Sequence, residues 1–131
     1  MKLAVIKETR PNEKRVALSP QIVKQLIAKG YEVIVEQGAG ELSAFTDQDY
    51  ETAGAQISNS KTSLFRDGDV FLKINSFTLE EISELKNGSI TLSLMYHSNH
   101  PEMLQALANQ GVSSFSMDAI PRISRAQSMD V

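Results

Sequence analysis

Short apolar runs rich in β-branched residues alternate along the chain with segments whose apolar positions recur at helical spacing. After the first run, Ile22, Val23 and Leu26 share one face of an expected helix. Buried strands and amphipathic helices produce these two patterns. Strands are expected at residues 3–6, 31–35, 55–57, 70–74, 89–95 and 112–117, and helices at 20–29, 46–51, 60–65, 78–86 and 99–109.

This alternation predicts an α/β fold. Each strand–helix–strand unit should cross over with the right hand, which gives a doubly wound parallel sheet with helices on both faces. About five strands are expected, in a flavodoxin- or Rossmann-like arrangement, because the run at 55–57 is short. The run at 112–117 reads as a buried strand. No internal repeat or linker interrupts residues 1–131, so one domain is predicted.

Local signals mark the ends of the helices. Ser19 is placed as an N-cap before a proline at the first helical position, and Gly30 as the residue that closes that helix. Thr46 with Asp49, and Thr78 with Glu81, have the spacing of a capping box. The segment 38–40 (Gly-Ala-Gly) lacks the third glycine of a dinucleotide loop and is better interpreted as a tight turn after a strand.

Composition narrows the possible functions. The chain has 131 residues, a formal net charge of −3 and no cysteine. An acidic balance gives no electrostatic case for nucleic acid, and without thiols there is no disulfide or thiolate metal site. No signal peptide or membrane span can be placed. We therefore expect a cytoplasmic protein, or a peripheral one on the cytoplasmic face of the inner membrane.

Three basic or titratable residues fall near the carboxyl ends of expected strands, where open α/β sheets bind ligands. Arg15 could bind a carboxylate or phosphate, or pair with Glu8 or Glu13 at the surface. Lys73 could reach into a ligand pocket, or protect an edge strand from pairing. His97 could move a proton or lie in a solvated loop. A metal bound by His97 and His100 is disfavoured, because no acidic ligand is nearby.

The segment after the last expected strand concentrates donors and acceptors. It carries Arg122, Arg125, Gln127 and Asp130 within nine residues. Arginine, glutamine and aspartate together can match an amide and a hydroxyl group. The same segment could also be no more than a solvated helix start.

Two segments carry a resemblance to a known family. Residues 7–20 (Lys-Glu-Thr-Arg-Pro-Asn-Glu-Lys-Arg-Val-Ala-Leu-Ser-Pro) and 30–40 resemble the opening of alanine dehydrogenases and pyridine nucleotide transhydrogenases. Residues 122–130 (Arg-Ile-Ser-Arg-Ala-Gln-Ser-Met-Asp) are similar to the NAD-binding alpha subunits of the proton-translocating transhydrogenases. The chain is thus identified as a member of this family.

The resemblance implies a two-lobed subunit with NAD(H) in the cleft between the lobes, and a helix from further along the subunit that completes the lobe seen here. It implies that Arg122, Gln127 and Asp130 surround the nicotinamide and its ribose and act as catalytic and cofactor-binding residues. Hydride then passes to NADP⁺ on a partner domain, coupled to proton movement through a membrane subunit. The complete subunit is expected to be a homodimer.

The second branch of the family implies other roles. In alanine dehydrogenases, residues matching Arg15, Lys73 and His97 hold the keto acid and move a proton. A chain of that branch, or a stand-alone docking or regulatory module, are the alternatives to a transhydrogenase lobe. No Gly-x-Gly-x-x-Gly follows a strand in this sequence. We therefore expect a domain that is incomplete at its C-terminus, binds NAD only with the second lobe, and is inactive alone.

Overall fold

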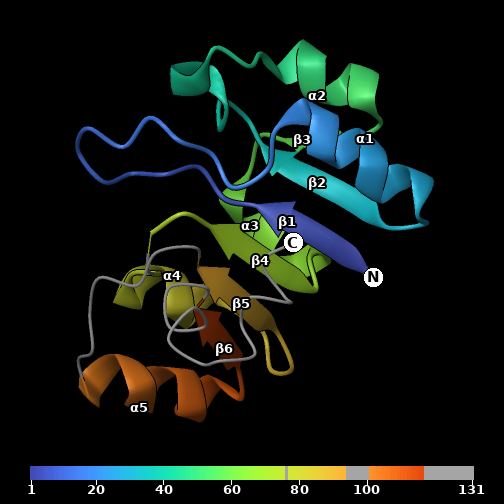
Figure 1. Ribbon diagram of the computed structural model, residues 1–131. Coiled ribbons are helices and arrows are strands. Elements are labelled where there is room, and N and C mark those ends of the chain that lie inside the picture. Colours follow the sequence, from blue (N-terminus) through green and yellow to red (C-terminus); the bar gives the residue numbers. More distant parts are fainter. Residues whose placement is uncertain (76, 94–100, 117–131) are drawn as a thin grey trace, which may run out of the picture.

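Six parallel strands form one sheet, and helices connect them (Figure 1). The computed structural model describes residues 1–75, 77–93 and 101–116, with the backbone alone at 101–104 and 116. The strands are β1 (Lys2–Val5), β2 (Glu32–Glu36), β3 (Gln56–Ser58), β4 (Val70–Lys73), β5 (Ile90–Ser93) and β6 (Ser113–Ser116). The helices are α1 (Pro20–Ala28), α2 (Asp47–Ala53), α3 (Lys61–Asp67), α4 (Leu79–Glu84) and α5 (Pro101–Gln110), with a 3-10 turn, η1 (Glu41–Ser43).

The strand order is β3-β2-β1-β4-β5-β6, and every neighbouring pair is parallel. The chain builds outward from β1 to β3, returns to the other side of β1 as β4, and continues outward to β6. The doubly wound α/β fold expected from the sequence is confirmed. The sheet has six strands rather than about five, because the short run near residue 57 pairs with β2 as an edge strand.

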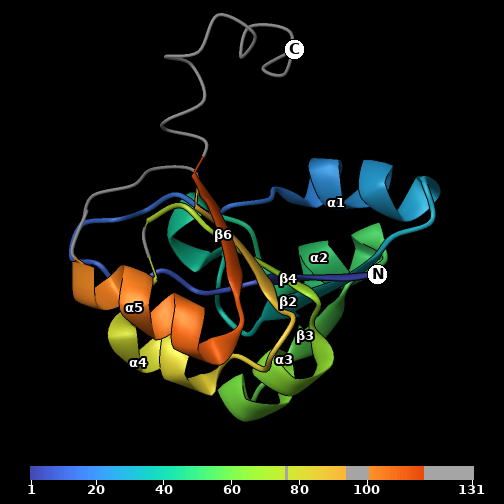
Figure 2. The same cartoon turned by 90° about the horizontal axis from the view of Figure 1, so that it is seen from below.

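The helices cover the two faces of the sheet unequally. One core joins the sheet to α3, α4 and α5 and is centred on Phe65, Phe71 and Ile82. The other joins it to α1 and α2 and is centred on Val23, Val35 and Tyr50. Figure 2 shows α3, α4 and α5 together on one side of the sheet and α1 on the opposite side.

The part of the second face formed by β5 and β6 has no helix over it within the described residues. The register places Leu72, Leu92 and Phe115 side by side on this face. Leu72 is buried, but Leu92 is half-buried and Phe115 is 57% exposed. Both β5 and β6 therefore present apolar side chains to the surface here.

The buried strand expected at 112–117 is in fact the exposed edge of the sheet. Within β6, Ser113 and Ser114 are exposed together with Phe115. The pattern misled because alternation with helices indicates that a strand exists, but the strand's place in the sheet depends on the topology. A last strand added outward from β5 must lie at the edge.

The capping signals are confirmed in the structure. The Ser19 hydroxyl accepts from the Ile22 amide, and both capping boxes form. The helix expected to run to residue 86 ends earlier, since Leu85 adopts an extended conformation and is buried in the core. The Gln110 amide donates to the carbonyls of Ile82, Ser83 and Leu85 and so satisfies that early end. The segment 38–40 is a turn, as expected.

Candidate functional site at the carboxyl edge of the sheet

The carboxyl ends of β1 and β4 are the topological switch point, where the chain departs to opposite sides of the sheet. Ligands of open α/β folds bind in the crevice at this position. The connection between β1 and α1, residues 6–19, passes over it. We refer to residues 7–15 of this connection as the β1–α1 loop.

Glu8 joins the β1–α1 loop to the end of β4. Its carboxylate accepts from the Ile74 amide at 2.8 Å, from the Asn75 amide at 3.2 Å and from the Asn75 side chain at 3.1 Å. Successive backbone N–H groups at the end of a strand are a natural anion site. Here an internal carboxylate occupies them.

Glu13 makes a second connection between the loop and the same asparagine. Its carboxylate accepts from Asn75 Nδ2 at 2.9 Å and from Arg15 Nε and Nη2, both at 2.8 Å. The hydrogen bonds from Arg15 lower the pKa of Glu13 to about 2, although burial opposes them. The same bonds raise the pKa of the Arg15 guanidinium. Arg15 therefore forms the surface pair with Glu13 that the sequence left open.

Lys73 lies in the middle of the sheet, so the interpretation as an edge-strand guard is wrong. Its side chain is 3% exposed, and its Nζ is 2.9 Å from Glu81 Oε1. The ammonium also lies 5.5 Å from the centre of the Phe77 ring. A buried lysine needs an anionic partner to remain charged, and the α4 capping box supplies it.

Glu81 serves three groups. Its Oε1 accepts from Lys73 and from the Thr78 amide at 2.8 Å, which is the capping-box bond of α4. Its Oε2 is buried, has no hydrogen bond within the part of the chain that the structure describes, and lies 3.9 Å from Lys61 Nζ. One carboxylate thus begins a helix and neutralises a buried cation.

A small polar cavity of about 200 Å³ opens at the switch point. It is lined by Thr9 and Arg10 from the β1–α1 loop and by Lys73, Asn75 and Thr78 from the segment around the end of β4. Hydroxyl and amide groups dominate, because the Lys73 charge is matched by Glu81. The cavity therefore suits a group that exchanges hydrogen bonds, such as an amide or a hydroxyl.

A larger cavity of about 410 Å³ lies beyond the end of β2. Lys7 and Gln37 line it together with Gly38, Glu41 and Asp47. The Asp47 carboxylate accepts from the Gly38 amide at 2.9 Å, so a side chain occupies the backbone donor that a phosphate would need. Gly38 is at φ +78° and is a turn residue. The geometry agrees with the interpretation of 38–40 as a turn.

Of the expected site residues, the structure describes Arg15 and Lys73. Both lie at the carboxyl edge, but only Lys73 lines the small cavity, and they do not contact each other. His97, Arg122, Gln127 and Asp130 lie outside the described residues. Their roles stay predictions.

Sequence reasoning missed the residues that organise the edge. Glu8 and Glu13 were considered only as surface partners of Arg15, Glu81 only as a helix cap, and Asn75 was not considered. The available signal was the presence of acids within a basic loop and one residue after each strand end. The pairing itself joins positions more than 60 residues apart in sequence, as in the Glu13–Asn75 contact.

Two kinds of site are absent from the described residues. No group of three or more histidine, aspartate or glutamate side chains among them could hold a metal ion. None of their helices has the length and hydropathy needed to cross a bilayer.

Fold and edge together define an α/β domain of the ligand-binding type, with a polar site at its switch point. Comparison with known proteins gives the family. Residues 4–131 match the model described as "Alanine dehydrogenase/PNT, N-terminal domain". The chain therefore belongs to the alanine dehydrogenase and transhydrogenase family, as the resemblance indicated.

Individual relatives agree with this result. The chain is 39% identical to an NAD(P) transhydrogenase alpha subunit of Rhodospirillum rubrum, over 100% of its own length and 35% of that protein. It superposes on a transhydrogenase from Sinorhizobium meliloti with a TM-score of 0.88 and 39% identity, covering 99% of this chain and 39% of that one. An L-alanine dehydrogenase gives 0.84 and 27%, covering 92% and 33%. The chain spans about a third of the length of these relatives.

Proposed function

We propose that this chain is the N-terminal lobe of the NAD(H)-binding alpha subunit of a proton-translocating NAD(P) transhydrogenase. The complete enzyme would pass hydride from NADH, bound between this lobe and a Rossmann lobe, to NADP⁺ on a separate domain. The observation that carries the proposal is the 39% identity to a transhydrogenase alpha subunit across the whole chain, against 27% to the alanine dehydrogenase structure over 92% of it.

The position of the C-terminal segment supports this role. β6 is parallel to the other strands, so it ends at the same edge of the sheet as β1 and β4. The segment with Arg122, Gln127 and Asp130 begins directly after β6 in sequence. In the proposed function the arginine and glutamine hydrogen-bond the nicotinamide carboxamide, and the aspartate accepts from the ribose.

The described residues fit one end of the cofactor and not the whole of it. The switch-point cavity of about 200 Å³ is smaller than a typical ligand pocket of roughly 300–1,000 Å³. Thr9, Asn75 and Thr78 offer hydroxyl and amide groups of the kind that bind a carboxamide. NAD would supply the hydride, and its pyrophosphate would be bound by the second lobe, since the sequence has no Gly-x-Gly-x-x-Gly.

The uncovered face of β5 and β6 supports the proposal that the lobe is completed by more of the same subunit. Leu92 and Phe115 form an apolar surface that a single domain would cover with a helix. The relatives extend well beyond the region that this chain matches, and a helix from that extension is the proposed cover. The assembled enzyme would be a homodimer of such subunits, joined to NADP-binding and membrane subunits at the cytoplasmic face of the inner membrane.

An alanine dehydrogenase lobe is the second candidate, and the presence of Arg15 and Lys73 favours it. Both cations are already paired, Arg15 with Glu13 and Lys73 with Glu81. Lys73 is also almost fully buried, so binding a keto acid would require breaking its pair with Glu81. This argues for the transhydrogenase branch.

Five alanine variants separate the branches in the complete subunit. Arg122→Ala, Gln127→Ala and Asp130→Ala should each slow single-turnover hydride transfer by about 10- to 150-fold, the range for one charge-assisted hydrogen bond expressed in the transition state. Lys73→Ala and His97→Ala should slow it less, after allowance for their unfolding midpoints. The proposal fails if Lys73→Ala and His97→Ala abolish the chemistry while the three C-terminal variants retain it.

A further inference from the structure

The β1–α1 loop separates its charges by direction. Residues 7–15 contain four basic and two acidic side chains on a chain whose net charge is −3. Both acids, Glu8 and Glu13, turn inward and bind Asn75. Of the bases, Arg15 is paired with Glu13, whereas Arg10 and Lys14 are exposed. Neither of these two side chains makes an ion pair or hydrogen bond with the described part of the chain.

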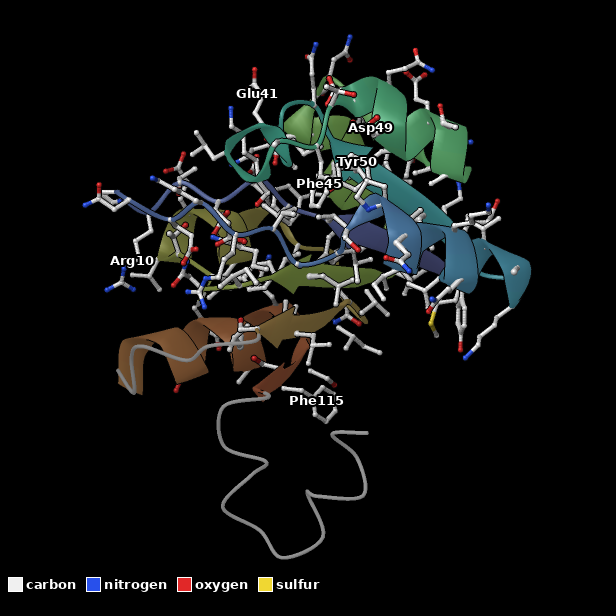
Figure 3. All side chains as sticks on the ribbon, turned by 45° about the horizontal axis from the view of Figure 1, so that its top comes forward. Arg10, Glu41, Phe45, Asp49, Tyr50 and Phe115 are labelled. Atoms are coloured by element: carbon white, nitrogen blue, oxygen red, sulfur yellow. The ribbon has the colours of Figure 1, made fainter. Side chains whose placement is uncertain are left out.

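The loop is held in shape while its cations point out. A turn closed by the Glu13 amide donating to the Arg10 carbonyl at 3.1 Å has Asn12 at φ +67°. The Ser43 hydroxyl donates to the Lys14 carbonyl, and the Lys7 amide donates to Glu36 at 2.9 Å. The loop extends beyond the strand ends in Figure 1, and Arg10 points away from the sheet in Figure 3.

The geometry suits a broad partner surface better than a small anion. A small anion needs several donors that converge on one point, as in a phosphate loop. Here Arg10 lines the small cavity, but Lys14 does not. Two exposed cations on a projecting, preorganised loop instead create a local positive potential that attracts an acidic surface.

We infer that the β1–α1 loop is a docking element for an acidic, carboxylate-bearing surface of the NADP-binding domain, with Arg10 and Lys14 as its charged contacts. The inference rests on the proposed function, because it names the partner from it. The loop lies at the lip of the proposed nicotinamide site, so docking there would place the two nicotinamides at the same edge. Rim charges of this kind act mainly on the association rate and its dependence on salt.

The test compares two charge-neutralised variants of the complete subunit. Arg10→Gln/Lys14→Gln removes the loop cations, and Lys24→Gln/Lys29→Gln removes two exposed lysines near α1, so both variants lose the same charge. The association rate with the isolated NADP-binding domain is measured by stopped flow at about 20 mM and about 300 mM NaCl. The loop variant should associate about five-fold more slowly at low salt, and the difference should shrink at high salt. The matched control should stay close to the parent protein.

The outcomes distinguish a failed docking role from a failed proposed function. If the parent subunit binds the NADP-binding domain and both variants bind at the same rate, the docking role is wrong and the proposed function stands. If the parent subunit does not bind that domain at all, the proposed function fails and the docking role fails with it. Unchanged unfolding midpoints in both variants exclude a folding defect, because none of the four side chains has a partner in the described structure.

Discussion

In the middle of the sheet, the Lys73–Glu81 pair places two charges where the rest of β4 is apolar. Their side chains are 3% and 6% exposed. Removing water from both ions costs free energy that their attraction and the Thr78 amide must offset. Such a pair contributes little net stability, but an unpaired member is strongly destabilising.

This asymmetry gives the first prediction. Lys73→Met should lower the free energy of unfolding by about 3–5 kcal/mol, because it leaves the Glu81 carboxylate buried without its cation. Adding Glu81→Gln should recover part of that loss, since the amide can still accept from Thr78. Urea titration of the two variants measures both values, with Lys24→Met on the exposed face of α1 as the control. A double variant less stable than Lys73→Met would contradict this explanation.

Glu13 gives a pH-dependent prediction. Its pKa is lowered from 4.5 to about 2 by Arg15, so folding favours the carboxylate. The resulting stabilisation is fully present above the unfolded pKa and is lost as the pH falls from about 5 toward 2. The melting temperature should therefore fall over this range, and Glu13→Gln should fall less steeply. The exposed Glu51→Gln variant is the control, and identical slopes for all three proteins would count against the pair.

At the scale of elements, Gln110 holds α4 and α5 together. One side-chain amide satisfies three carbonyls at the early end of α4, and the shortest bond, to Leu85, is 2.8 Å. Gln110→Ala should destabilise the fold by about 1–2 kcal/mol, because it leaves carbonyls of a half-buried helix end without a donor. Gln105→Ala, which removes only an exposed bond to Asn109, should change stability by less than about 0.5 kcal/mol. Denaturant midpoints of the two variants decide the matter.

The same elements show what the sequence could and could not predict. Ser19, Thr46 and Thr78 were recognisable as caps, because each acts within three residues of itself. The early end of α4 was not, since it depends on Gln110, which lies 25 residues from Leu85. Lys73 was noticed as unusual, but its partner could be identified only once α4 was placed against β4. Local chemistry was predictable, and long-range pairing was not.

At the scale of the whole molecule, the unequal cover of the sheet decides how the chain should behave alone. Leu92 and Phe115 lie on a face that no described helix covers, at the edge of a parallel sheet. Edge strands with exposed apolar side chains favour association with other chains. Whatever covers this face must come from the rest of the subunit or from another molecule.

Activity at this scale gives the last prediction. The chain carries the segment proposed to contact nicotinamide but no Gly-x-Gly-x-x-Gly for the pyrophosphate, so most of the binding energy for NADH lies outside it. We expect the isolated 131-residue chain to give no measurable NADH-dependent reduction of an NADP⁺ analogue, even with the NADP-binding domain present. Joining it to the remaining lobe should restore turnover, and the absorbance of the reduced analogue measures both cases. Steady turnover by the isolated chain would mean that a complete hydride-donor site lies within these residues, and the assignment as half of a cleft would then be wrong.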